Sequence, residues 1–323
     1  MSGGWREKLG SLRDRIFGPQ ARAPDAPATA APLQKREPQP PLHSSSEFPI
    51  ISINFGIDFG TSFTKVCFRD VGTEESGVVA FGERSGHLLP TIVAINSSGK
   101  LLCADEEPRG GEITRIQYLK MRLAGASFGS PLPVIRGIDL NEPTVVRALS
   151  SWFLARVLQR SQQNMAKHER DRLKNRRPVW SANVGVPVEH CDSAAIEAFR
   201  QVLATACLWI KRDQVPSTVD ELLPSYDRTL PELTAEIADF HAVPEIAAAV
   251  QSFVMSREAE PGIYIYFDIG GGTIDGMAFD FINDNGARRI NFYSGKVAPL
   301  GLSALAAALG QNIGGDIAAD ELE

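Results

Sequence analysis

The chain repeats one short pattern, in which an apolar strand-like run ends in an aspartate and leads into a glycine turn. Asp58 is followed by Phe-Gly-Thr-Ser, and Asp268 is followed by Ile-Gly-Gly-Gly-Thr. Apolar residues precede each aspartate, and a second apolar stretch follows each turn. Strand, turn and strand in this order are typical of a β-hairpin. Two such hairpins, far apart in the sequence, predict two similar half-domains that face each other across a cleft.

The residue types in the two turns predict that they bind phosphate. Glycine allows close approach of the backbone to a ligand, and successive N–H groups in such turns form a concave nest for anions. A carboxylate beside this nest would repel phosphate unless a cation lies between them, and Mg²⁺ binds through one or two carboxylates plus phosphate oxygens. We therefore assign Asp58 and Asp268 as Mg²⁺ anchors that act through water.

Both turns contribute residues to the predicted phosphate cradle. It consists of Gly60, Thr61, Ser62, Gly270, Gly271, Gly272 and Thr273. The hydroxyl groups in this set would bond to phosphate oxygens or to a water molecule. The alternative interpretation is two ordinary tight hairpins in which the aspartates serve as turn residues. Two matched copies favour the phosphate interpretation.

The two motifs resemble the phosphate motifs of the actin, sugar-kinase and heat-shock-chaperone ATPase superfamily, nearest to the nucleotide-binding domain of DnaK-type chaperones. Stretches between the motifs are similar to that domain in the same order, so the resemblance covers about residues 52–315. They are residues 89–95, 118–123, 183–187 and 244–249. The resemblance implies a two-lobed, actin-like α/β fold of duplicated ribonuclease-H-like domains that binds ATP and Mg²⁺.

The resemblance also implies four catalytic residues. Asp268 would be required for hydrolysis, Glu245 would position metal-bound water, and Lys120 or Thr273 would orient the attacking water. The assignment of Lys120 depends on the alignment, because a shift by one residue places Met121 there. The carboxylate of Glu245 has an alternative role, which is to favour the N-terminus of a helix.

The first fifty residues differ in composition from the rest of the chain. Residues 18–50 are rich in Pro and Ala and cannot bury enough apolar surface to fold, which predicts an extended tether. Residues 1–17 predict a short amphipathic helix whose apolar stripe consists of Trp5, Leu9, Leu12 and Ile16. Such a helix would dock on a protein partner or a membrane surface. The alternative is a frayed tail.

We expect residues 51–257 to form a first lobe with an insertion at about 211–242, and residues 258–323 to begin a second lobe. Apolar residues at helical spacing predict a helix from Thr144 to about Lys174. In the insertion, Thr229 to Glu232 matches a capping box, which predicts the start of a short helix.

The second lobe is expected to be incomplete. The chaperones' adenosine motif, a Gly-Gly turn followed by Ser or Thr and Arg, has no equivalent that we find, and neither has their peptide-binding domain. Either the product is truncated or split, or a second chain completes the ATPase lobe.

Composition agrees with a folded cytoplasmic domain. The chain has 323 residues, of which 43% are hydrophobic, so it can bury a large core. Its net charge of −6 offers no general basic surface, which disfavours nucleic acid as a partner. The four cysteines form no C-x-x-C pair, which favours buried reduced thiols. No apolar run has membrane-spanning length, and the N-terminus lacks the apolar region of a signal peptide.

The sequence is compatible with three alternative functions. The first is a slowly hydrolysing, DnaK-type chaperone-like ATPase that acts as a component of a larger assembly. The second is a catalytically inactive scaffold that has kept the nucleotide-binding fold. The third is a small-molecule kinase or a filament subunit of the same superfamily, although no sugar-binding motif is legible and the intermediate stretches are more similar to the chaperones.

Overall fold

The structure is a computed structural model, and its described residues all belong to the second of the two units into which the chain divides, Glu47–Glu323. They are residues 48–82, 85–107, 111–125, 130–186, 195–235, 241–244, 250, 253–254, 256, 258–284, 287–298 and 300–302. The predicted N-terminal helix, most of the predicted tether and Glu245 lie outside this set. The expected continuation of the second lobe beyond Leu302 also lies outside it.

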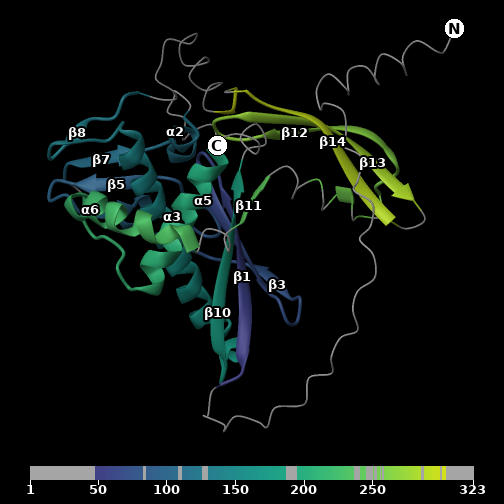
Figure 1. Cartoon of the computed structure of the whole chain (residues 1–323), viewed down its shortest axis with the longest axis horizontal. Helices are drawn as coiled ribbons and strands as arrows, with labels where there is room; N and C mark the ends of the chain where they lie inside the picture. The colour runs from purple at the N-terminus through teal and green to yellow at the C-terminus, as the bar shows by residue number, and fades with distance from the viewer. Residues whose placement is uncertain are drawn as a thin grey trace, which may run out of the picture. The chain divides into compact units, whose positions relative to one another are not determined.

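The largest sheet has six strands in the order β11-β10-β1-β2-β3, with β4 paired to β2 (Figure 1). Its strands are β1 (Ile50–Phe59), β2 (Phe63–Asp70), β3 (Ser76–Val78), β4 (Leu89–Pro90), β10 (Arg177–Val186) and β11 (His241–Pro244). β1 runs antiparallel to β2 and parallel to β10, so the sheet is mixed. The first predicted hairpin is therefore confirmed.

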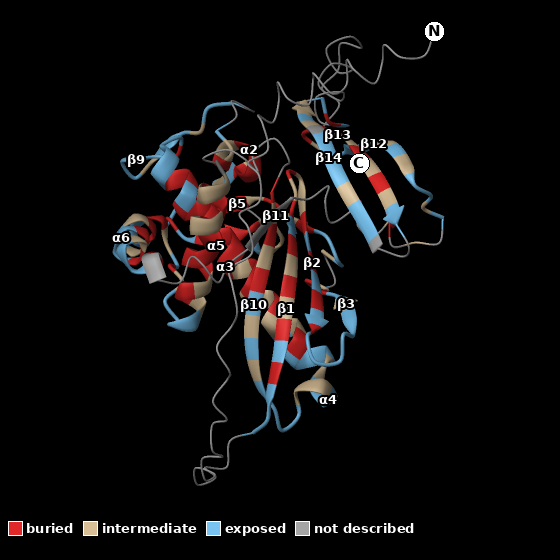
Figure 2. Cartoon of the chain, turned by 45° about the vertical axis from the view of Figure 1, so that its right-hand side comes forward, coloured by how far each residue is buried: buried red, intermediate tan, exposed pale blue. Residues whose placement is uncertain are grey.

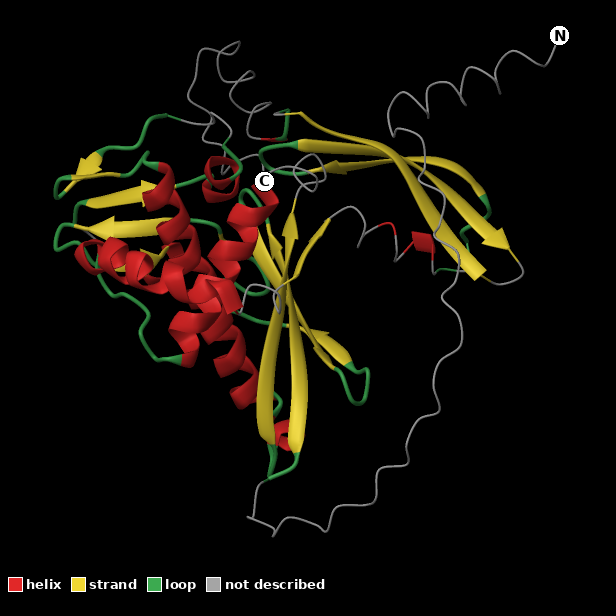
Figure 3. Ribbon diagram, viewed as in Figure 1, coloured by secondary structure: helices red, strands yellow, loops and turns green. Residues whose placement is uncertain are grey.

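Two long helices cover one face of this sheet (Figure 3). They are α3 (Pro143–His168) and α5 (Ala195–Lys211). Every second residue of β1, from Ile51 to Phe59, is buried, and the C-terminal half of β10 has the same alternation (Figure 2). The ring of Phe59 lies 5.9 Å from Phe153 of α3 and 6.5 Å from Phe199 of α5, centroid to centroid. This aromatic packing fixes the end of β1, where Asp58 lies.

Smaller elements complete this part of the molecule. β5 (Val93–Asn96) is the central strand of a sheet with β6 (Leu101–Cys103) and β7 (Ile113–Ile116), and β8 (Val134–Ile135) pairs with β9 (Ile138–Asp139). The remaining helices are η1 (Ala104–Glu106), α2 (Leu119–Leu123), α4 (Arg170–Leu173), α6 (Val219–Thr229) and η3 (Leu230–Ala235). None of the helices that the structure describes is long and apolar enough to cross a membrane.

Some predicted boundaries are wrong. The helix expected from Thr144 to about Lys174 is interrupted at Glu169, which separates α3 from α4. The short helix predicted after Thr229 is present as η3, but the capping box is wrong, because Thr229 is the last residue of α6. Its hydroxyl donates to the carbonyl of Ser225 and accepts from the Trp209 indole, so it is not placed to cap a following helix. The true cap is Thr218, whose side chain accepts from the N–H of Glu221.

A separate antiparallel sheet has the order β12-β13-β14, with β12 (Gly262–Ile269), β13 (Ile274–Asp284) and β14 (Ala287–Ala298). It contains the second predicted hairpin, which is confirmed. One face of the sheet carries a small core of Val250, Val254, Met277, Phe279 and Phe281. The chain is therefore a mixed α/β protein with several sheets, in agreement with the predicted class.

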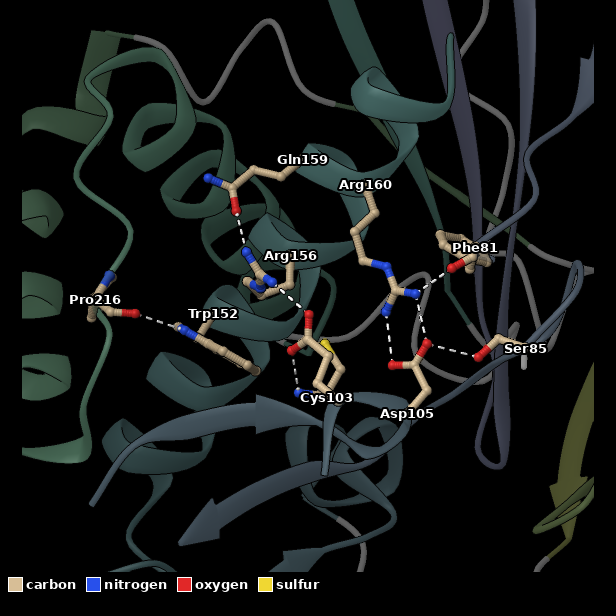
Figure 4. A network of polar contacts seen from close by, with 10 residues as sticks. Phe81, Ser85, Cys103, Asp105, Trp152, Arg156, Gln159, Arg160 and Pro216 are labelled. Atoms are coloured by element: carbon tan, nitrogen blue, oxygen red, sulfur yellow. Dashed lines mark hydrogen bonds and ion pairs between the residues drawn. The ribbon is translucent and has the colours of Figure 1, made fainter. Parts of the chain in front are cut away.

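The segment that leads from β3 toward the site is attached to α3 by a partly buried ion pair (Figure 4). The guanidinium of Arg160 donates to both carboxylate oxygens of Asp105, at 2.8 and 2.6 Å, and also to the carbonyl of Phe81. The Ser85 hydroxyl donates to the same carboxylate at 2.9 Å. Burial alone would raise the pKa of the Asp105 carboxyl, but the hydrogen bonds from Arg160 and Ser85 hold that pKa below its usual value.

We predict that Asp105→Asn lowers the free energy of unfolding at pH 7 by about 2 kcal/mol, because it leaves the partly buried Arg160 charge without its anion. A lowered carboxyl pKa stabilises the fold above the unfolded-state value and loses that effect as the pH falls. The difference between wild type and variant should therefore shrink below about pH 4. Denaturant unfolding at several pH values measures this.

Asp220→Asn is the matched control for this experiment, since the Arg136–Asp220 pair is about half exposed on both sides. Its removal should change stability by less than about 1 kcal/mol. Equal losses from the two variants would contradict the role assigned to the partly buried pair.

Candidate functional site

The two predicted hairpins have the same register around their turns. In the first, Asp58 lies opposite Lys65, and the last pair before the turn is Phe59 with Thr64. In the second, Asp268 lies opposite Asp275, and the last pair is Ile269 with Ile274. The turns, residues 60–63 and 270–273, are therefore equal in length and follow their aspartates at the same distance. The repetition in the sequence is matched by a repetition in the backbone.

Glycine is required in both turns by close approach rather than by an unusual φ. A Cβ on Gly60 would lie 2.2 Å from the carbonyl oxygen of Phe63, so the first turn cannot close over a side chain. A Cβ on Gly272 would lie 2.5 Å from Cγ2 of Thr61. The second contact joins the hairpins, because it brings the tip of one turn against the tip of the other.

A cavity of about 340 Å³ lies where the turns meet. Its lining includes the predicted residues Asp58, Gly60, Thr61 and Ser62 of the first hairpin, Asp268, Gly270, Gly271 and Thr273 of the second, and Lys120 of α2. Gly272 is not part of the lining but packs on Thr61. The volume is at the lower end of the range of about 300–1,000 Å³ for small-molecule sites. Sequences far apart in the chain thus converge on one cavity.

Lys120 is almost completely buried, with 5% of its surface exposed. The alternative alignment would place Met121 in this role, and Met121 is also buried, but it is not among the described residues that line the cavity. An ammonium group taken out of water is expensive unless polar groups surround it. The geometry therefore favours Lys120 over Met121 as the functional residue of α2.

Two charged residues of the cavity were missed by the sequence reasoning. Lys65 and Asp275 are the cross-strand partners of Asp58 and Asp268. The register of each hairpin was the signal that could have found them, because directly opposed side chains are close neighbours. The Lys65 ammonium lies 3.5 Å from the Asp58 carboxylate, and both side chains are about half exposed, so this pair adds little stability.

Asp275 differs from Lys65 in its surroundings, since it is buried. Its carboxylate accepts a hydrogen bond from the hydroxyl of Thr273, which is also buried, at 3.3 Å. The cavity thus combines three carboxylates with two ammonium groups. Within the described ranges, no group of three or more His, Cys, Asp or Glu side chains is arranged to hold a metal ion.

The three cysteines that the structure describes lie apart from this cavity. Cys103 is buried, and burial raises the pKa of its thiol to about 12, which keeps it protonated. Cys67 is exposed, so the favoured buried environment does not apply to it; its position on β2 faces away from the helices. Cys207 is partly buried, and Cys191 lies outside the described residues.

Comparison with protein-family models finds no family that matches the chain, and comparison with curated proteins finds no similar sequence. The resemblance to DnaK-type chaperones therefore stays a prediction. The shared register of the hairpins and the common cavity are properties of this molecule and do not depend on that resemblance.

We predict that Gly60→Ala lowers the free energy of unfolding by about 1–3 kcal/mol, because the added methyl meets a backbone carbonyl that is unable to rotate away. Gly56→Ala, in the strand β1 that precedes this turn, is the control. Its methyl would lie 2.9 Å from the Cys67 sulfur, a side-chain atom that is able to move. Denaturant unfolding compares the two, and an equal or larger loss for Gly56→Ala would contradict the prediction.

Proposed function

We propose that the protein binds Mg–ATP in this cavity and hydrolyses it slowly, as a DnaK-type chaperone-like ATPase with two actin-like lobes. The observation that carries the proposal is that two hairpins of matched register each bring an aspartate and a glycine turn to one cavity. Two ordinary hairpins would have no reason to place their turns against each other with the same register.

The residues of the cavity fit a triphosphate. Lys65 and Lys120 supply positive charge for phosphate oxygens, and the hydroxyls of Thr61 and Ser62 supply donors. Carbonyl oxygens would repel phosphate, and two of those in the second turn already accept hydrogen bonds from the protein backbone. The carbonyl of Gly270 accepts from Leu302 at 3.1 Å, and that of Gly272 accepts from Gly301 at 3.3 Å.

The same residues fit Mg²⁺. Asp58 and Asp268 both line the cavity, and Mg²⁺ is commonly held by one or two carboxylates together with water and phosphate oxygens. When bound, the ion would neutralise charge on the transferred phosphoryl group. A site of this kind needs no third protein carboxylate.

The hydroxyl of Thr273 is prepared to orient water. It donates its hydrogen to the buried carboxylate of Asp275, so its oxygen lone pairs remain to accept a hydrogen bond from a water molecule. A water held in this way presents its own oxygen to a phosphoryl group. Lys120 would hold the phosphate side of the cavity, and Phe63, Leu88 and Leu302 contribute apolar lining.

We further propose that the ATPase acts within a larger assembly. The N-terminal helix predicted from the sequence would recruit a protein partner or a membrane surface. If the polar groups of the cavity bind no nucleotide, the favoured function becomes that of a scaffold that kept the fold.

Both aspartates should be needed for Mg²⁺-dependent ATP binding or hydrolysis. We expect Asp268→Ala to abolish hydrolysis and Asp58→Ala to weaken the affinity for Mg–ATP by about tenfold or more, since each removes a metal anchor. Isothermal calorimetry and phosphate release measure the two effects. Asp220→Ala, on the exposed surface of α6, is the control and should behave as wild type. Wild-type affinity in both site variants would refute the assignment, and absence of binding by the wild type would favour the scaffold.

Lys120 and Glu245 should act on the chemical step. We expect Lys120→Met, which keeps the volume of the side chain but removes its charge, and Glu245→Gln to slow single-turnover hydrolysis while Mg–ATP binding is retained. Met121→Leu is the control for packing in α2, because Met121 is buried beside Lys120 without lining the cavity. Unchanged turnover in Lys120→Met or Glu245→Gln would remove that residue from the mechanism.

A further inference from the structure

Both glycine turns are held from outside through the same carbonyl. Ser62 and Gly272 occupy equivalent positions, each the third residue of its turn. The carbonyl of Ser62 accepts from the backbone N–H of Thr91 at 2.8 Å, and the carbonyl of Gly272 accepts from the backbone N–H of Gly301 at 3.3 Å. The two donors belong to unrelated segments, one between β4 and β5 and the other after β14. The duplication therefore includes the turns and also the backbone hydrogen bonds that hold them.

We propose that Thr91 and Gly301 are positioning residues of the site, which direct one backbone N–H of each turn toward the bound phosphates. This inference rests on the proposed function. A peptide unit is planar and trans, so its C=O and the N–H of the next residue point in opposite directions. A support that fixes the carbonyls of Ser62 and Gly272 thereby turns the N–H groups of Phe63 and Thr273 away from it.

The cavity lies on the side of the turns opposite to Thr91 and Gly301. Phe63 and Thr273 are part of its lining, whereas neither Thr91 nor Gly301 belongs to the lining described for it. In an anion nest, the direction of successive N–H groups determines the binding. Hydrogen bonds that hold the carbonyls outward before the ligand arrives would preorganise the nest, so that no reorientation is needed on binding.

Thr91 is attached to the first hairpin by a second contact. Its hydroxyl and that of Thr64 form a hydrogen bond of 2.9 Å, and both side chains are completely buried. Thr64 is the first residue of β2 that pairs with β1 after the turn. The hydroxyl pair therefore fixes the position from which the Thr91 N–H reaches Ser62. The break between β4 and β5 occurs here.

Gly301 is constrained by contact with the second turn. A Cβ at this position would lie 2.5 Å from the carbonyl oxygen of Gly270, the carbonyl carbon of Gly272 and the nitrogen of Thr273. The φ of Gly301 is outside the left-handed region, so alanine is permitted by its own backbone. The three atoms nearest to an added Cβ at residue 301 all belong to the turn, which makes the substitution a probe of the turn.

The experiment compares Gly301→Ala with Gly262→Ala in the full chain. Gly262 also lies outside the left-handed region, and an added Cβ there meets no atom within 4 Å. Calorimetry with Mg–ATP and with Mg–tripolyphosphate, together with a melting temperature for each variant, separates affinity from stability. We expect Gly301→Ala to lower the affinity for both ligands by about tenfold or more, since a displaced nest loses its alignment. Gly262→Ala should bind both ligands with wild-type affinity.

A second pair of variants keeps the test decisive if Gly301→Ala fails to fold. Thr91→Val keeps the volume of the side chain and removes its hydroxyl, whereas Thr91→Ser keeps the hydroxyl. We expect Thr91→Val to lower the affinity for Mg–ATP by about fivefold. Thr91→Ser should have wild-type affinity. Serine keeps the hydroxyl but fills less space than valine. If packing alone mattered, Thr91→Ser would bind less well than Thr91→Val, so wild-type affinity in Thr91→Ser assigns the effect to the hydroxyl.

The outcomes distinguish this inference from the proposed function. If the wild type binds neither Mg–ATP nor Mg–tripolyphosphate, the proposed function fails and this inference fails with it. If the wild type binds and the folded Gly301→Ala and Thr91→Val variants bind equally well, the site stands and the positioning roles are overturned. Weakened binding in Thr91→Ser to the level of Thr91→Val would also overturn the role of the Thr91 hydroxyl.

Discussion

The site depends on the absence of a side chain at Gly272, because a Cβ there would lie 2.5 Å from Cγ2 of Thr61. This contact brings the tips of two hairpins together, and the cavity, with its convergent carboxylates and ammonium groups, exists only because the tips meet. The packing of Phe59 between α3 and α5 holds one side of the contact in place. Chemistry at the cavity therefore rests on close packing at one point.

The surroundings of the cavity are arranged to keep that point rigid. The partly buried pair of Arg160 and Asp105 attaches the segment before β4 to α3, and this segment leads through Leu88 of the cavity to Thr91. An ion pair of this kind contributes little net stability relative to an apolar contact, but its directional hydrogen bonds restrict where the chain lies. Specific placement, more than stability, is its contribution to the site.

Local signals in the sequence predicted local features well. Alternation in β1 and the aspartate–glycine turns predicted both hairpins, and their duplication predicted the convergence of Asp58 and Asp268 on one cavity. The failures are of another kind. The capping box at Thr229 was a valid local pattern, but a hydrogen bond from the distant Trp209 engages that hydroxyl instead. Lys65 and Asp275 were missed because the cross-strand register that brings them to the site was not used, although the turns determine it. The supporting role of Thr91 depends on a contact between segments that no local pattern encodes.

The hydrogen bond from Leu302 to Gly270 has a mechanical consequence. The last described residues leave β14 and cross directly behind the second turn, where the N–H groups of Gly301 and Leu302 bond to its carbonyls. A load applied to the chain after Leu302 therefore reaches the turn through these two bonds before it reaches the long ladder between β13 and β14. The turn that follows Asp268 is therefore the first part of this sheet to bear a force applied to the chain after Leu302.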